Sequence, residues 1–113
     1  MNNVIAVSAV LDSPSALTQE QGEKIYKIIS DSIDAKKEIA LDFSGIESMI
    51  SPFLNIAVGK LYGAYSSADI NSYLKFYNFP ESKLSTLKVV IANAKKFYEN
   101  KEDYASTVKD VIG

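Results

Sequence analysis

The hydrophobic and polar positions along the chain predict strands that alternate with helices. Val4–Leu11 is an unbroken run of Val, Ile, Ala, Ser and Leu. Such a run is typical of an interior strand that is covered on both faces. A short apolar run that ends in turn residues predicts a second strand at Ile39–Phe43. Tyr73–Tyr77 alternates and is rich in strand-forming residues, and Lys75 places this third strand near an edge of the sheet.

A helix is predicted between the first two strands. Thr18 and Gln21 have the spacing of a capping box, in which each side chain accepts a hydrogen bond from the backbone of the other residue. Beyond them, four isoleucines recur at helical spacing through about Lys36, and these are Ile25, Ile28, Ile29 and Ile33. Isoleucines in this pattern indicate a face that packs against the core.

The second helix is predicted to begin at Ser51, as N-cap, with Pro52 at its first helical position. Its apolar face comprises Leu54, Ala57, Val58, Leu61 and Tyr65. Gly59 and Gly63 lie within this helix, and glycines there indicate the close approach of a neighbouring backbone.

A third helical stripe follows the last strand, formed by Leu84, Leu87, Ile91, Ala94 and Tyr98. Tyr104–Ile112 is predicted to be one more short helix. The order of elements indicates a single α/β domain over residues 1–113. Its sheet is expected to be small, largely parallel or mixed, with about four strands flanked by helices and a C-terminal helical extension.

Composition and charge narrow the classes of function. A chain of 113 residues has the size of one domain. The formal net charge of −2 is too near neutral to favour nucleic acid. No apolar run approaches the roughly 20 residues that cross a bilayer, so no membrane association is expected. The opening residues Met1 to Asn3 lack the basic start of a signal peptide, which predicts a cytoplasmic protein.

The chain contains neither cysteine nor histidine. Disulfides, cysteine nucleophiles, Cys/His zinc sites and Ser-His-Asp hydrolysis are therefore excluded. The five glycines never cluster into a phosphate-binding loop. No carboxylate grouping on one face argues for a metal. We expect no catalytic residues, no metal and no cofactor.

Asp42, at the end of the second predicted strand, has two interpretations. It could be a catalytic carboxylate, but the sequence places no second carboxylate beside it. The favoured interpretation is that Asp42, with Ser44 and Gly45, shapes the following loop by accepting hydrogen bonds from backbone amides.

The segment LDFSGIESMISPFL, residues 41–54, resembles the signature segment of STAS domains, named for sulphate transporters and anti-sigma factor antagonists. In that family a strand ending in Leu-Asp-Leu/Phe-Ser-Gly-Val precedes Asp-Ser-Ser-Gly at the start of a helix. Leu41–Ile46 matches the first part, and Ser51 falls on the serine that is phosphorylated in the antagonists. The second part differs, because Ile50, Pro52 and Phe53 stand where Asp, a small polar residue and Gly are usual.

The chain is still more similar to the STAS-like family of unknown function. The matching features are a GxxIYxII helix at Gly22–Ile29, the LDFSGIES segment, the Phe53–Leu61 helix and LKFYN at Leu74–Asn78. The resemblance extends from Ile5 to Asn100. It implies a protein–protein switch without enzyme activity, and the partners of the antagonists are ATPases of the histidine-kinase fold.

Two hypotheses for function follow. In the first, a regulatory module docks on a kinase-fold ATPase or another signalling protein through Ser48, Met49, Ser51 and Phe53, with Met49 and Phe53 expected to be apolar and exposed. Phosphorylation of Ser51 would switch docking, although a serine that only caps a helix would need no such role. In the second, the start of the helix after Ser51 binds a small ligand, nucleotide or other anion. Whether the chain forms a homodimer stays open, as does the packing of Tyr104–Ile112.

Overall fold

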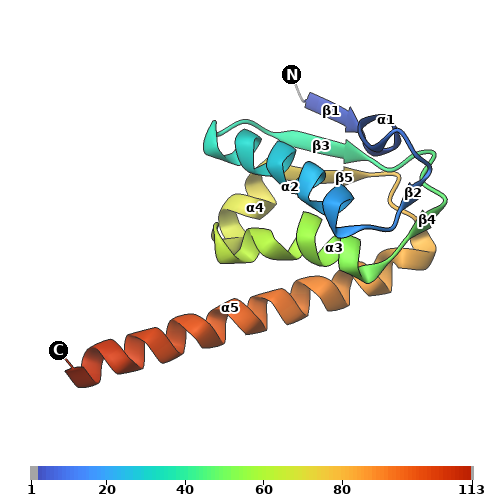
Figure 1. Ribbon diagram of the computed structural model, residues 1–113. Coiled ribbons are helices and arrows are strands. Elements are labelled where there is room, and N and C mark those ends of the chain that lie inside the picture. Colours follow the sequence, from blue (N-terminus) through green and yellow to red (C-terminus); the bar gives the residue numbers. More distant parts are fainter. Residues whose placement is uncertain (1–2, 113) are drawn as a thin grey trace.

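The centre of the computed structural model, which describes the backbone of residues 3–112 and the side chains of residues 3–98, is a parallel sheet of three strands. The strands are β1 (Asn3–Ala6), β3 (Ile39–Asp42) and β5 (Leu74–Tyr77), in the order β1-β3-β5 (Figure 1). β3 is therefore the interior strand, and its residues Ile39, Ala40 and Leu41 are buried.

A second, smaller sheet joins two loops. β2 (Ser15–Ala16) pairs in parallel with β4 (Ser48–Met49). Five strands thus form two sheets in the described residues, where the sequence predicted a single sheet of about four. The pairing holds the segment before the helix Gln19–Asp34 beside the loop that leads into the helix Ser51–Ala57.

Helices make up the other layers. They are α1 (Val7–Leu11), α2 (Gln19–Asp34), α3 (Ser51–Ala57), the 3-10 helix η1 (Gly59–Gly63), α4 (Ser67–Tyr73), the 3-10 turn η2 (Glu81–Lys83) and α5 (Leu84–Ile112). α3 and η1 lie between α2 and α5 (Figure 1). None of the described helices has the length and apolar character that crossing a membrane requires.

α2 agrees closely with its prediction. Thr18 Oγ1 accepts a hydrogen bond from Gln21 N at 3.0 Å, and Gln21 Oε1 accepts one from Thr18 N at 3.1 Å, which confirms the capping box. Ile25, Ile29 and Ile33 are buried in the core, whereas Ile28 is only partly buried.

The prediction of one interior strand over Val4–Leu11 is wrong. Only Asn3–Ala6 is a strand, and it lies at the edge of the sheet, with the Val4 side chain 53% exposed. Val7–Leu11 forms α1, where the buried Val7 and Leu11 are four residues apart on one side of a helical turn. An unbroken apolar run carries no period that separates a strand from a helix.

The helix predicted after Ser51 is divided and begins one residue earlier than expected. Ile50 is the N-cap, so Ser51 is the first residue of α3 rather than its cap. η1 continues the chain through the two glycines. At Gly63 it is the side-chain ring of Tyr98, from α5, that comes close, where the sequence predicted a neighbouring backbone.

α5 is one continuous helix where two were predicted. Leu87 and Val90 are buried, and Ile91 packs against the core. Leu84, which the stripe placed on the packed face, is 39% exposed. The side chains of the predicted Tyr104–Ile112 helix lie outside the described residues.

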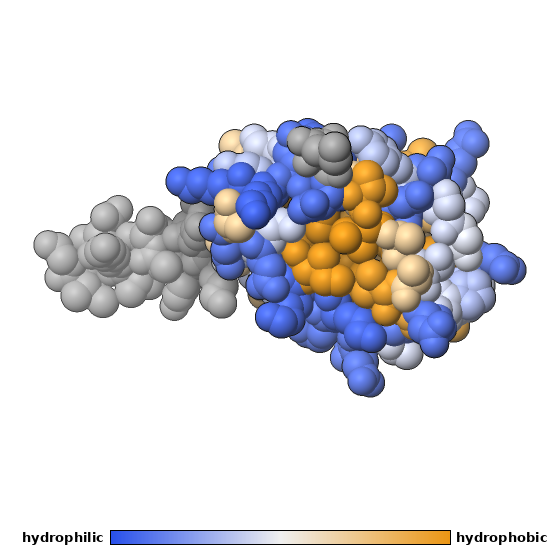
Figure 2. All heavy atoms as spheres, turned by 90° about the horizontal axis from the view of Figure 1, so that it is seen from above, coloured by the Kyte–Doolittle hydropathy of each residue, from blue (hydrophilic) through white to orange (hydrophobic). Residues whose placement is uncertain are grey.

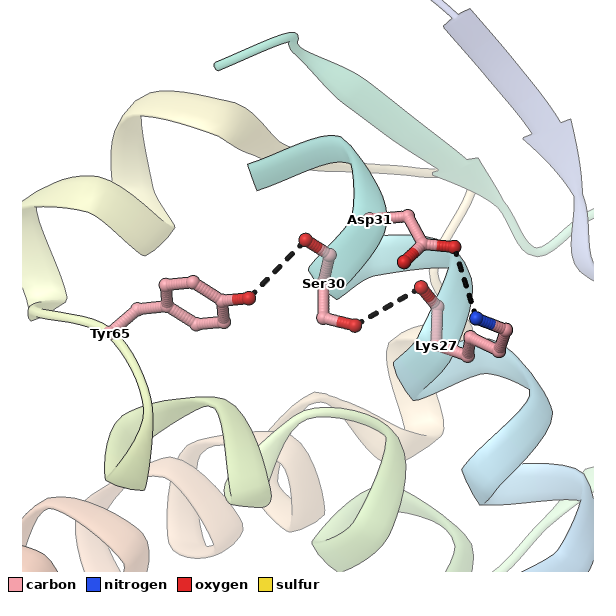
Figure 3. Close-up of polar contacts among 4 residues, drawn as sticks. All are labelled: Lys27, Ser30, Asp31 and Tyr65. Atoms are coloured by element: carbon pink, nitrogen blue, oxygen red, sulfur yellow. Dashed lines mark hydrogen bonds and ion pairs between the residues drawn. The ribbon is translucent and has the colours of Figure 1, made fainter. Parts of the chain in front are cut away.

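Tyr65, just after η1, connects the segment that follows η1 to α2 (Figure 3). Its hydroxyl donates to Asp34 Oδ1 at 2.7 Å and lies 3.2 Å from the carbonyl oxygen of Ser30. Lys27 and Asp31, on the same helix, form an ion pair at 3.5 Å with both side chains well exposed. An exposed pair of this kind contributes little stability, and it lies within α2, so of these contacts only those of Tyr65 join α2 to another segment.

Candidate functional site

The loop that follows β3 is shaped by Asp42. Its Oδ1 accepts hydrogen bonds from Ser44 N at 2.9 Å and from Asn78 Nδ2 at 3.0 Å. Both bonds lower the pKa of the Asp42 carboxyl, and the bond from the Ser44 amide has the larger effect. Through these two bonds Asp42 holds the loop and links the ends of β3 and β5.

Ser44 and Gly45 complete this turn. Gly45 has a φ of +85°, a left-handed conformation that favours glycine. The hydroxyl of Ser8 in α1 donates to the carbonyl oxygen of Ser44 at 3.4 Å. Both residues thus lie in the turn that follows β3.

An aromatic cluster that the sequence did not predict lies below this loop. The rings of Phe43 and Phe79 meet edge to face with centroids 4.8 Å apart, and Phe76 lies 6.0 Å from Phe43 and 5.9 Å from Phe79. Asn78, at a φ of 55°, makes the turn that brings Phe79 back to the strand ends. The cluster fixes the base of the loop that leads to Ser51.

The expectation that Met49 and Phe53 are exposed is wrong. Met49 is 2% exposed, because alternation along β4 points Ser48 outward and Met49 into the core. Phe53 is fully buried on α3 and belongs to the core cluster. Neither side chain is available to a partner. In the predicted docking segment, the exposed residues are Ser48, Ile50, Ser51 and Pro52.

Ser51 instead shares a surface groove with α5. The groove has a volume of about 450 Å³ and lies between the start of α3 and the first turns of α5. Ser51, Asn55, Ser85, Thr86, Val89, Val90 and Asn93 line it. We call this the Ser51 groove. The Val89 side chain is 57% exposed and Val90 is buried, so an apolar centre is surrounded by uncharged polar groups.

The α5 side of the Ser51 groove was missed in the sequence. A signal is present: Ser85, Val89 and Asn93 recur every four residues on one uncharged line of a helix otherwise rich in lysine. Only the tertiary fold reveals that this line faces Ser51.

The start of α3 is a poor anion site. α3 has seven residues, and Pro52 has no N–H in its first turn. A better place for a small ligand is a hollow of about 440 Å³ between η1 and α5, whose walls include Tyr62, Tyr65, Lys95 and Tyr98. Lys95 Nζ lies 5.8 Å from the Tyr62 ring centroid. Among the described residues, no group of three or more acidic side chains is placed to hold a metal ion.

Fold and loop together define an α/β domain of the STAS-like class. A family model described as the STAS-like domain of unknown function matches residues 21–83. The chain belongs to this family. No curated protein and no solved structure matched the chain. The matched segment includes α2 from Gln21 onward, β3, the Asp42 loop and Ser51, whereas β1 and the α5 side of the Ser51 groove lie outside it.

Proposed function

We propose that this domain is a regulatory interaction module without catalytic activity, and that a partner protein docks in the Ser51 groove. The observation that carries the proposal is the position of Ser51, exposed at the first residue of α3 and facing α5 across an open groove. An exposed apolar centre with a polar rim is the usual anatomy of a protein interface.

The same geometry supports a phosphorylation switch. A phosphate on Ser51 would add about −1.5 to −2 charges to a groove whose lining residues are all uncharged. Ser51 is exposed, so the added charge would remain in solvent and the domain would stay folded. An apolar or acidic partner surface would be repelled.

A histidine-kinase-fold ATPase, or another signalling protein, is the proposed partner. The support is the resemblance of Leu41–Ile46 to the antagonist signature and the matching position of Ser51. We further propose that the protein works in the cytoplasm, where such partners act.

The test is a pull-down from the native host with wild type, Ser51→Ala, Ser51→Glu and Val89→Asp as baits. Ser48→Glu is the matched control, because Ser48 is an exposed serine outside the groove. We expect a kinase-fold ATPase with wild type, Ser51→Ala and Ser48→Glu, its loss with the other two, and phosphate on Ser51 by mass spectrometry. Equal capture by all five baits, without phosphate on Ser51, would show that this groove is not the docking site.

A second candidate function, binding of a small anionic ligand or nucleotide, is supported by the hollow beside Tyr62 and Lys95. A thermal-shift screen with nucleotides and inorganic phosphate separates the two functions, because a bound ligand raises the midpoint with concentration. Stabilisation that Lys95→Ala abolishes would favour the ligand-binding function.

A further inference from the structure

The strand β1 has one open edge. Within residues 3–112, β1 pairs only with β3, and its other side meets no strand. Asn3, Val4 and Ala6 are exposed. An open edge presents backbone donors and acceptors that an added strand can pair.

An apolar area adjoins this edge. Figure 2 shows hydrophobic atoms gathered on the face seen from above Figure 1, with hydrophilic atoms around them. The residues of β1, α1 and α2 that are apolar, large and still accessible are Val4, Ile5, Val10 and Ile28. Val4 and Ile5 are consecutive in β1 and point to opposite faces of the sheet, so these four residues surround the open edge on both sides. We call them the β1 patch.

The position of Ile28 on α2 explains why the β1 patch stays open. At 100° per residue, Ile28 falls on the opposite side of the buried stripe from Tyr26 and Ser30. Tyr26 and Ser30 face η1 and the segment after it, through Lys60 above the Tyr26 ring and Tyr65 beside the Ser30 carbonyl. α3 and η1 thus cover one flank of α2, and α2 also contacts α1, the helix that directly follows β1.

The geometry points to a second copy of this chain as the occupant of the β1 edge and patch. Two β1 strands related by a two-fold axis pair antiparallel, and the two three-stranded sheets become one sheet of six. In a two-fold contact each surface meets itself, so apolar patch meets apolar patch. This face is separate from the Ser51 groove, and the inference does not depend on the proposed function.

The charges on α2 fit the same symmetry. Lys24, Lys27 and Asp31 are exposed around Ile28. If two α2 helices run antiparallel about a point between Lys27 and Ile28, Lys24 of each copy stands opposite Asp31 of the other. Asp31 already pairs with Lys27 of its own helix at 3.5 Å, and Lys24 of the other copy would add a second cation beside it, which favours pairing with a second copy.

The test is the molar mass of the full chain by light scattering during size-exclusion chromatography, over a series of concentrations. We expect wild type to reach twice 12.4 kDa. Val4→Lys places like charges near the axis and should raise the dissociation constant by about a hundredfold or more. Val89→Lys is the matched control, because Val89 is exposed to a similar extent (57% against 53%) on α5, and it should remain dimeric.

Circular dichroism and thermal unfolding must show that Val4→Lys keeps the fold. Hydrogen exchange supplies an independent measurement, since β1 amides should gain protection as wild type is concentrated and should not do so in Val4→Lys. A wild type that stays at 12.4 kDa at all concentrations overturns the inference. A dimer that survives Val4→Lys places the interface elsewhere and overturns it equally.

Discussion

Gly22 of α2 lies so close to Ile56 of α3 that a Cβ atom at Gly22 would stand 2.8 Å from the Ile56 Cβ and 2.9 Å from the Phe53 carbonyl oxygen. Real Cβ atoms do not approach backbone oxygen this closely, so the two helices are in contact at the level of the main chain. This contact sets the position of α3, and therefore of Ser51, relative to α2.

Gly22→Ala should destabilise the domain by about 1–3 kcal/mol, because the overpacking at the helix contact exceeds the higher helix propensity of alanine. Urea denaturation gives the change in the free energy of unfolding. Gly59→Ala is the control, since a Cβ there would meet Val90 at 3.6 Å and Ala94 at 3.7 Å, which are ordinary contacts. Stabilisation by Gly22→Ala would mean that α2 and α3 are farther apart.

Thr18→Ala and Ser51→Ala should differ, although both remove a hydroxyl at a helix start. Thr18 forms the capping box with Gln21, and its loss should cost about 1 kcal/mol of unfolding free energy. Ser51 is not the N-cap, so its substitution should stay within about 0.5 kcal/mol. Thermal unfolding of both variants measures the difference, and an equal loss would restore Ser51 as a structural cap.

The Tyr65 phenol should titrate at a higher pH than an ordinary tyrosine. The hydrogen bond to Asp34 raises the pKa of Tyr65 to about 12. Folding favours the protonated phenol of Tyr65. The contribution of this group to the stability of the fold is therefore fully present below the unfolded pKa of about 10, and it is lost as pH rises through about 12. Ultraviolet titration should show a tyrosine that ionises at high pH. Tyr65→Phe should remove this titration step, and Asp34→Asn should move it to lower pH. An unchanged curve in Asp34→Asn would contradict the assigned bond.

Asp42→Asn should destabilise the domain at neutral pH and much less in acid. The pKa of Asp42 is lowered by the Ser44 amide and then by Asn78, so its contribution is present above the unfolded pKa of about 3.9. It is lost as pH falls through the lower pKa of the folded state. Urea denaturation of wild type and variant at pH 7 and below pH 4 tests this. Asn78→Ala should raise the Asp42 pKa in a carboxyl NMR titration, and a constant pKa would count against the bond.

The sequence predicted those features that depend on local spacing. The isoleucines of α2, the Thr18–Gln21 capping box and the buried strand at Ile39 have periods or short motifs that few alternatives share. The family signature from Leu41 to Ile46 lies in the same central part of the chain, which the family model also matches.

The errors come from contacts between distant segments. Whether Met49 is exposed depends on the pairing of β4 with β2, and whether Phe53 is exposed depends on how α3 meets α2 at Gly22. Neither contact has a signal within a few residues of the side chain concerned. For the same reason Met49 and Phe53 were wrongly predicted to be exposed neighbours of Ser51.

The parallel sheet also has a consequence for how the chain folds. Asn3 pairs with Ile39, and Ile39 pairs with Leu74, so each ladder closes a long stretch of chain and no hairpin joins neighbouring strands of this sheet. Such distant pairings must be formed before they stabilise anything, which slows folding. During synthesis on the ribosome, β3 has no partner on its β5 side until Leu74–Tyr77 emerges. The domain is therefore expected to complete its fold late, and to be most exposed to misassociation just before that point.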